Sequence, residues 1–78
     1  MTLEIISPQE VMFSGKAELV TMPGALGSFT VLNNHASLIS VLTPGKVVYR
    51  TPEGEEKSVE IKGGLADVDN NVVAVCVY

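Results

Sequence analysis

The feature that most constrains this chain of 78 residues is the short, regular spacing of its turn-forming residues. Such residues recur roughly every eight to twelve positions, which is the spacing of strands in small sandwiches and barrels. Pro followed by Gly predicts a type II turn, because Pro presets φ and Gly accepts a positive φ. The predicted turns are Ser7-Pro8, Ser14-Gly15, Pro23-Gly24, Asn33-Asn34, Pro44-Gly45, Pro52-Glu53-Gly54, Gly63-Gly64 and Asp69-Asn70-Asn71.

The runs between these turns have the composition and the period of strands. Residues 57–62 alternate cleanly between apolar and polar side chains, and residues 46–51 place Val47 and Tyr49 on one side with Lys46, Val48 and Arg50 on the other. Both patterns indicate half-buried strands. No segment has a sustained helical period, so we predict an all-β fold. It is a small antiparallel β-sandwich of about 8–10 short strands, with residues 1–78 as a single domain. The side chains predicted to point inward from these two runs are Val47, Tyr49, Val59 and Ile61.

Two segments, residues 38–42 and 72–78, break the alternation because they are apolar on both faces. A strand of this kind either lies centrally in a two-sided core or has one face covered by another chain. The chain is 46% hydrophobic, which is high for so small a domain. We therefore expect exposed apolar surface that binds a partner.

Charge and cysteine content exclude several classes of function. The net charge is −4 and the five Lys and Arg residues are scattered, which argues against nucleic-acid binding and against insertion into anionic lipid. The single cysteine cannot form an internal disulfide, which predicts a reducing compartment. The first residues lack the basic and apolar pattern of a signal peptide, and no apolar run is long enough to span a membrane.

The only histidine, His35, invites a catalytic interpretation that its surroundings do not support. No serine lies in a G-x-S-x-G context, and one His with one Cys is too few for a metal site. We therefore predict no catalytic residue, no metal and no cofactor. Gly63-Gly64 is expected to mark a bulge or a close approach of two strands, since strand-like residues follow it.

Two charged features have simple interpretations. The acidic run Glu53-Gly54-Glu55-Glu56 is expected to be a solvated hairpin tip. Lys46, beside a predicted turn, leaves open a second function: a small carrier domain of the lipoyl or biotinyl kind, modified on a hairpin lysine.

Several segments, taken in order, resemble one family. The chain is similar to the N-terminal β-sandwich domain of the epsilon subunit of F-type ATP synthase over its whole length. No single motif is specific, but the order and spacing of the motifs are. They are Leu3-Glu4-Ile5-Ile6-Ser7-Pro8, Val11-Met12-Phe13-Ser14-Gly15, Lys16 to Thr21, Gly27 to Leu32 followed by His35-Ala36, Leu42-Thr43-Pro44-Gly45, Gly63 to Val68 and Asn71 to Val77.

The resemblance implies a non-catalytic subunit of the rotor. Such a subunit docks on the gamma subunit of the central stalk, rests on the polar loops of the membrane c-ring, and couples proton translocation to ATP synthesis. It implies a peripheral location on the cytoplasmic face of the bacterial inner membrane. It also implies that a partner interface with gamma or the c-ring includes Ala25, Leu26, Asn33, Asn34, His35, Ala36 and Leu38.

The chain departs from the family pattern in ways that limit what is carried over. Asn34 and Ser37 stand where the family often has Gly and Pro, and Ala25 replaces a common acidic residue. That last change weakens the case for an ion pair with the c-ring at this position. The two-helix C-terminal domain, with its ATP-binding and inhibitory roles, has no counterpart here. That domain is either naturally absent or removed, and the absence of a linker after Tyr78 slightly favours a naturally short form.

Overall fold

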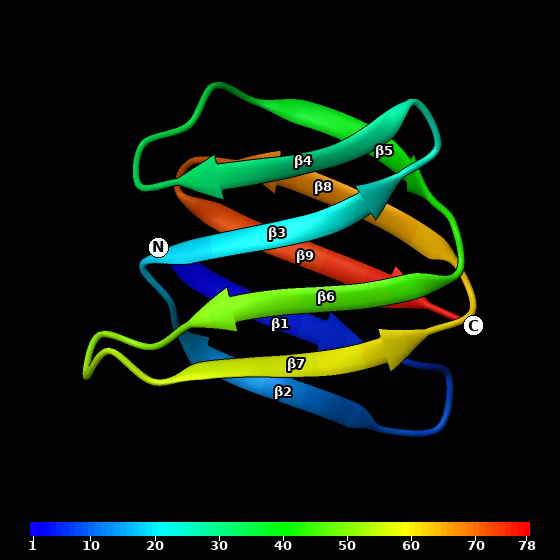
Figure 1. Ribbon diagram of the computed structural model, residues 1–78, viewed down its shortest axis with the longest axis horizontal. Coiled ribbons are helices and arrows are strands. Elements are labelled where there is room, and N and C mark those ends of the chain that lie inside the picture. The colour runs from blue at the N-terminus through cyan, green and yellow to red at the C-terminus, as the bar shows by residue number, and fades with distance from the viewer.

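The computed structural model describes residues 1–78 as nine short strands without a helix (Figure 1). The all-β prediction and the predicted number of strands are confirmed. No helix is therefore present that could cross a membrane. The strands are β1 (Thr2–Ile6), β2 (Val11–Lys16), β3 (Leu19–Gly24), β4 (Gly27–Leu32), β5 (Leu38–Leu42), β6 (Gly45–Arg50), β7 (Glu56–Ile61), β8 (Gly64–Asp69) and β9 (Val72–Val77).

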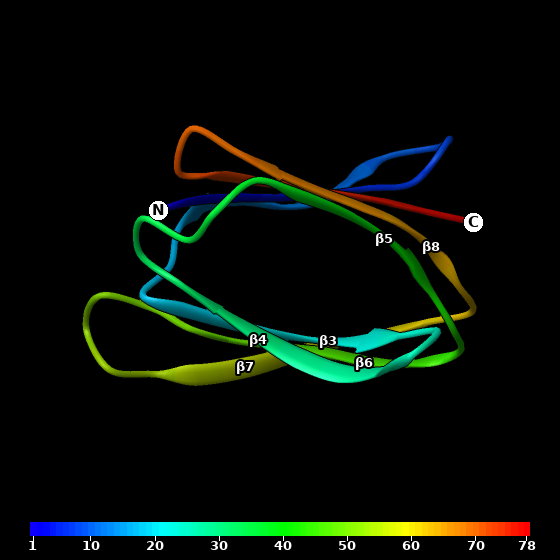
Figure 2. The same ribbon diagram turned by 90° about the horizontal axis from the view of Figure 1, so that it is seen from above.

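The strands form one sheet that folds over itself into two layers (Figure 2). One layer has the order β2-β1-β9-β8-β5, and the other has the order β4-β3-β6-β7. The layers meet where β5 ends: Gly24 pairs with Leu42, and the Thr43 amide donates to the Pro23 carbonyl at 2.8 Å. All pairs are antiparallel except β1 and β9, which run parallel. Figure 1 shows β9 beside β1, with both strands running from the side of the N-terminus toward the side of the C-terminus.

The core lies between the layers and is formed by strands in which buried and more exposed side chains alternate. In β1, β3, β8 and β9, every second residue is buried. The inward positions predicted for residues 46–51 and 57–62 are correct: Val47, Tyr49 and Ile61 are buried, and Val59 packs half-buried against them. Each of these side chains contributes roughly 1.5–3 kcal/mol when fully removed from water. The core thus consists mainly of aliphatic side chains contributed by both layers.

Three predicted turns are wrong, because the residues lie in or next to strands. Ser14-Gly15 is in β2, where Gly15 pairs with Leu3 and the Phe13 ring covers it. Pro23-Gly24 ends β3, and the turn that follows is Ala25-Leu26. At Pro44-Gly45 the chain bends, but Gly45 begins β6 and has no positive φ, so the type II geometry is absent at both Pro-Gly pairs.

The remaining glycine and asparagine signals act as predicted. Asn70 and Asn71 both have positive φ, 49° and 62°, which is the geometry of a two-residue type I′ hairpin between β8 and β9. Gly54, with φ 91°, lies at the tip of the acidic hairpin. At Gly64 an added Cβ would lie 2.2 Å from the Cys76 carbonyl oxygen. The predicted close approach of two strands at Gly63-Gly64 is therefore confirmed.

Candidate functional site: a groove between β4 and β5

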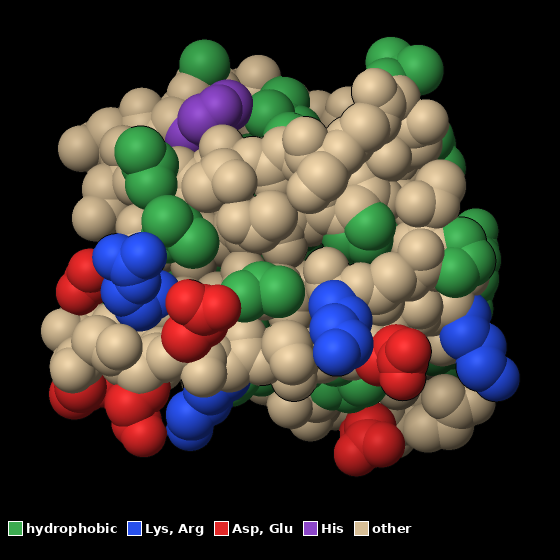
Figure 3. Space-filling model, in the orientation of Figure 1, with side chains coloured by type: hydrophobic (Ala, Val, Ile, Leu, Met, Phe, Trp, Pro, Cys, Tyr) green, Lys and Arg blue, Asp and Glu red, His purple; other side chains and the backbone are tan.

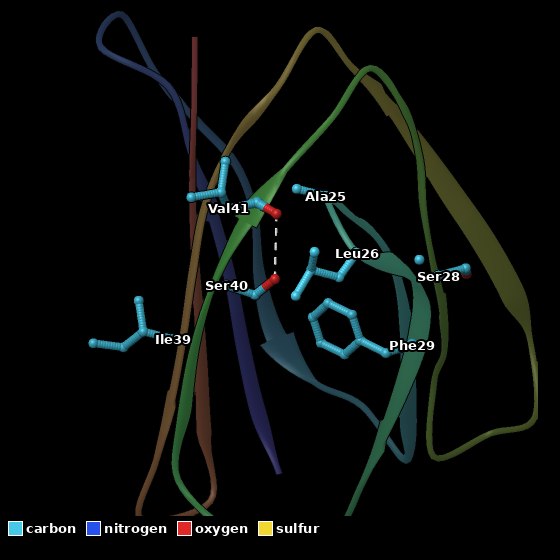
Figure 4. A pocket seen from close by; sticks show the side chains of 8 residues that line it. Ala25, Leu26, Ser28, Phe29, Ile39, Ser40 and Val41 are labelled. Carbon is cyan, nitrogen blue, oxygen red and sulfur yellow. Dashed lines mark hydrogen bonds between the residues drawn. The ribbon is translucent and has the colours of Figure 1, made fainter.

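A shallow groove runs along the open side of the sandwich, where β4 of one layer faces β5 of the other without pairing to it. We call it the edge groove. Its lining comes from the β3–β4 turn, β4 and β5, and its far end reaches His35 and Leu38. In Figure 4, Leu26 and Phe29 project between the two ribbons, whereas Ile39 points to the other side of β5. Residues of the groove are Ala25, Leu26, Gly27, Ser28, Phe29, Thr30, His35, Leu38, Ile39, Ser40 and Val41.

The edge groove is lined by apolar and small polar side chains, together with His35, and by no Asp, Glu, Lys or Arg. Phe29 and Leu38 lie half-buried against the core and form its floor. On its rim, Leu26 is fully exposed, and Ile39 and Val41 are 70% and 57% exposed. Large apolar residues this exposed are costly unless another molecule covers them.

The absence of charge extends well beyond the groove. No Asp, Glu, Lys or Arg occurs from Leu19 to Gly45, a stretch that comprises β3, β4 and β5. Figure 3 shows the consequence: charged side chains gather over β6 and β7, and the upper half of this face has none. Depletion of charge with retention of apolar side chains is the compositional mark of the centre of a protein interface.

The predicted interface residues fall at the two ends of this groove rather than in one patch. Ala25 and Leu26 form the turn before β4, and Asn33 to Ala36 form the loop after it. These groups are therefore separated by the length of β4, six residues or about 20 Å. Leu38 lies beside the His35 loop and joins the floor of the groove. The structure thus brings Leu38 and His35 together and holds Leu26 apart from them.

The loop of residues 33–37 is exposed, yet several hydrogen bonds fix it. The Asn33 side chain accepts from the α-amino group of Met1. The Asn34 amide donates to Asn71 Oδ1 at 2.8 Å, and the Ser37 hydroxyl donates to Asp69 Oδ1 at 2.6 Å. Asn34 has φ 64°, a conformation that suits Asn and Gly, which explains why Asn can replace the glycine of the family pattern.

His35 has the contacts of a loop residue. Its Nδ1 lies 2.7 Å from the carbonyl oxygen of Ala36, and its backbone amide donates to Leu32 at 3.2 Å. Its ring has no carboxylate among its hydrogen-bond partners. No cluster of three His, Cys, Asp or Glu side chains is present that could hold a metal ion. The geometry of this loop fits recognition by surface contact.

A second apolar surface agrees with the exposed apolar surface predicted from residues 38–42 and 72–78, but the sequence did not predict its extent. On the outer face of the β2-β1-β9-β8-β5 layer, the register aligns one apolar or sulfur-bearing side chain from each strand into a row. This row is Val41, Leu65, Cys76, Ile6 and Val11. The only sequence feature that indicated this surface was the presence of apolar residues on both faces of residues 38–42 and 72–78. The row itself depends on strand order, which joins β1 to β9 across almost the whole chain.

Lys46 does not occupy the position that a carrier domain requires. It is the second residue of β6, where it is paired with Glu60 of β7. The tip of that hairpin, at Pro52 to Gly54, lies at the other end of β6. Lys46 was predicted to lie beside a turn, but in the structure it lies within a strand.

Fold and groove together define a small β-sandwich domain with one exposed, uncharged edge. The chain belongs to the family of ATP synthase delta/epsilon chain β-sandwich domains, whose family model matches residues 1–78. The particular resemblance is to the epsilon chain. The chain is 41% identical to the ATP synthase epsilon chain of Nitratiruptor over 91% of its length, and 43% identical to that of Stenotrophomonas maltophilia over 92%.

The chain spans about half the length of these curated relatives, 55% and 51%. Among solved structures, it is similar to a chain of the Euglena gracilis mitochondrial ATP synthase, with a TM-score of 0.90 and 23% identity over 96% of this chain and 48% of that one. A chain of the Tetrahymena thermophila ATP synthase central stalk and c-ring gives a TM-score of 0.82 at 17% identity, covering 97% and 61%. At these identities the structural likeness establishes the fold.

Proposed function

We propose that this chain is a non-catalytic component of the central stalk of an F-type ATP synthase, where it links the gamma subunit to the polar loops of the c-ring. In this role it helps to couple proton translocation to ATP synthesis. It works at the cytoplasmic face of the bacterial inner membrane as a peripheral component of the complex, without cofactor, nucleic acid or direct insertion into lipid.

The observation that carries this proposal is the uncharged edge groove. It joins the two predicted contact segments, Ala25-Leu26 at one end and Asn33 to Ala36 at the other. Because about 20 Å separates the ends of β4, one end can contact gamma while the other contacts the c-ring. A rotor component must also pass torque without yielding, and a densely packed sandwich of nine strands is weakly compressible.

Site-specific crosslinking to a reconstituted stalk tests this proposal. Because Cys76 is the only cysteine and is exposed, a Cys76→Ser background allows single cysteines to be introduced elsewhere. Ala25→Cys and Ala36→Cys, carrying a photoactivatable crosslinker, should give products with gamma or with subunit c. Lys57→Cys, at an exposed position of β7 outside the groove, is the matched control and should give neither. Crosslinks from Lys57→Cys alone would contradict the proposal.

A further inference from the structure

The loop that carries His35 is held by the turn of a distant hairpin. Two of its hydrogen bonds end on β8–β9 side chains: Asn34 N–H to Asn71 Oδ1 at 2.8 Å, and Ser37 Oγ to Asp69 Oδ1 at 2.6 Å. These partners are 37 and 32 residues away in the sequence. The bonds lie on either side of His35 and Ala36, so they fix the two ends of the segment that was predicted to contact a partner.

We propose that Asn71 and Asp69 are positioning residues for docking: they hold the His35 loop in the conformation that its partner recognises. The inference rests on the proposed function, because it assumes that this loop is part of the interface. Neither residue needs to touch the partner itself. Each acts through the loop. Because the loop is already ordered in the free chain, binding does not have to bear the entropic cost of ordering it.

The physical case comes from the loop's own composition. Its residues are exposed and leave it little apolar contact with the core, so packing alone cannot fix it. Asn34 adopts a left-handed φ of 64°, which an L-residue occupies only when its surroundings favour it. The bond from its amide to Asn71 supplies that bias. Ser37, at the start of the approach to β5, is fixed in the same way by Asp69.

The turn itself provides a matched pair of variants. Asn70 and Asn71 both have positive φ, 49° and 62°, so glycine fits at either position without strain. Only Asn71 accepts a hydrogen bond from the loop with its side-chain oxygen. Asn71→Gly therefore removes the tether while preserving the hairpin, and Asn70→Gly makes the same chemical change without removing it.

Two readouts on the full chain separate positioning from folding. Hydrogen exchange of the Asn34 amide should accelerate on the order of tenfold in Asn71→Gly, because the amide loses its acceptor, and stay unchanged in Asn70→Gly. Affinity for the reconstituted stalk of gamma and c-ring should fall by a similar factor in Asn71→Gly only. Amides of β9 serve as an internal reference, and their protection should be equal in both variants.

The second tether has its own test. Ser37→Ala removes the donor and should weaken docking, whereas Asp69→Asn keeps an oxygen acceptor and should retain most of the affinity. That pattern assigns the effect to the hydrogen bond. If Asp69→Asn weakens docking as much as Ser37→Ala does, the charge of Asp69 acts on the partner and the positioning role of Asp69 is overturned.

The failures of the two proposals are distinguishable. If the unaltered chain does not bind the stalk, the proposed function fails, and the docking role of the tethers fails with it. If the unaltered chain binds and Asn71→Gly binds equally well, the inference alone is overturned, whether or not Asn34 exchanges faster. Weaker binding of Asn71→Gly together with faster exchange at Asn34 supports it.

Discussion

The rings of Phe13 and Tyr49 stack against each other across the two layers of the sandwich, with centroids 4.4 Å apart and planes inclined by 35°. Phe13 comes from β2 and Tyr49 from β6, and these strands do not pair. The contact closes the side of the sandwich opposite the edge groove. One side of the molecule is thus sealed by aromatic side chains and the other remains open.

Phe13→Ala should therefore destabilise the domain. The substitution removes the aromatic pair and uncovers Gly15, over which the Phe13 ring lies. Because Phe13 is only partly buried, the free energy of unfolding should fall by about 2–3 kcal/mol, less than for a fully buried phenylalanine. Urea denaturation measures this change. Phe13→Leu, which keeps most of the apolar volume, should cost about half as much, and equal losses for the two variants would argue against a specific role of the ring.

Gly64→Ala should be among the most damaging single substitutions in the chain. Its new Cβ would lie 2.2 Å from the carbonyl oxygen and 3.0 Å from the Cα of the two residues opposite, so the β8–β9 pair must separate. We expect a loss of about 3 kcal/mol or failure to fold. At Gly54, where an added Cβ meets nothing, Gly54→Asn should cost about 1 kcal/mol or less. Thermal melts of both variants decide the matter, and similar midpoints would contradict the predicted clash.

A negative charge on the rim of the edge groove should weaken docking without unfolding the domain. Ile39→Glu replaces a side chain that is 70% exposed, so the free energy of unfolding should change by about 0.5 kcal/mol or less. Burying an unpaired carboxylate in an apolar interface should reduce affinity for the stalk by about 30-fold or more. Val11→Glu, at a residue 60% exposed on β2, is the control. A greater loss for Val11→Glu would move the interface across the same layer, away from β5 and toward its opposite edge at β2.

His35 should act in recognition rather than in chemistry. His35→Gln keeps a polar side chain in an exposed loop, so stability should change by no more than about 0.5 kcal/mol. Affinity for gamma or the c-ring should fall by about fivefold, the effect of losing a contact worth about 1 kcal/mol. Isothermal titration with each partner measures this. Unchanged affinity for both partners would remove His35 from the interface.

The carrier hypothesis can be tested with a single measurement. Because Lys46 is paired with Glu60 inside a hairpin rather than placed at its tip, we expect no enzyme to attach lipoate or biotin to it. Intact mass spectrometry of chain purified from its native cells should give the mass of the unmodified sequence. An added lipoyl or biotinyl mass that disappears in Lys46→Arg would instead establish the carrier function.

Much of the fold could be read from local patterns because these patterns report burial directly. Alternation in residues 46–51 and 57–62 identified which side chains face inward, since a strand places successive residues on opposite faces. Gly63-Gly64 was recognised as a close approach for a similarly local reason. The failures at Ser14-Gly15 and Pro23-Gly24 have a common cause: both pairs suit a turn locally, but each is held extended by strand pairing with a residue distant in sequence. Gly15 pairs with Leu3, and Gly24 pairs with Leu42.

The candidate site was predicted only in part. Matching the family pattern indicated Leu26 and the His35 loop, but it could not show that β4 separates them or that β5 supplies the opposite wall of a groove. The charge-free stretch from Leu19 to Gly45 is visible in the sequence. It indicates a candidate interface only once the structure shows that its strands β3, β4 and β5 gather on one side of the molecule.

The sequence by itself determined that this protein is a small all-β domain, which side chains of residues 46–51 and 57–62 face its core, and where most of its hairpins turn. The reason is that propensity, alternation and positive φ are properties of neighbours along the chain. The tertiary structure alone decided the parallel pairing of β1 with β9, the open edge between β4 and β5, and the contact of Asn71 with Asn34. Those features join residues that are far apart in sequence. They follow from how the layers close over a shared core, which no local pattern encodes.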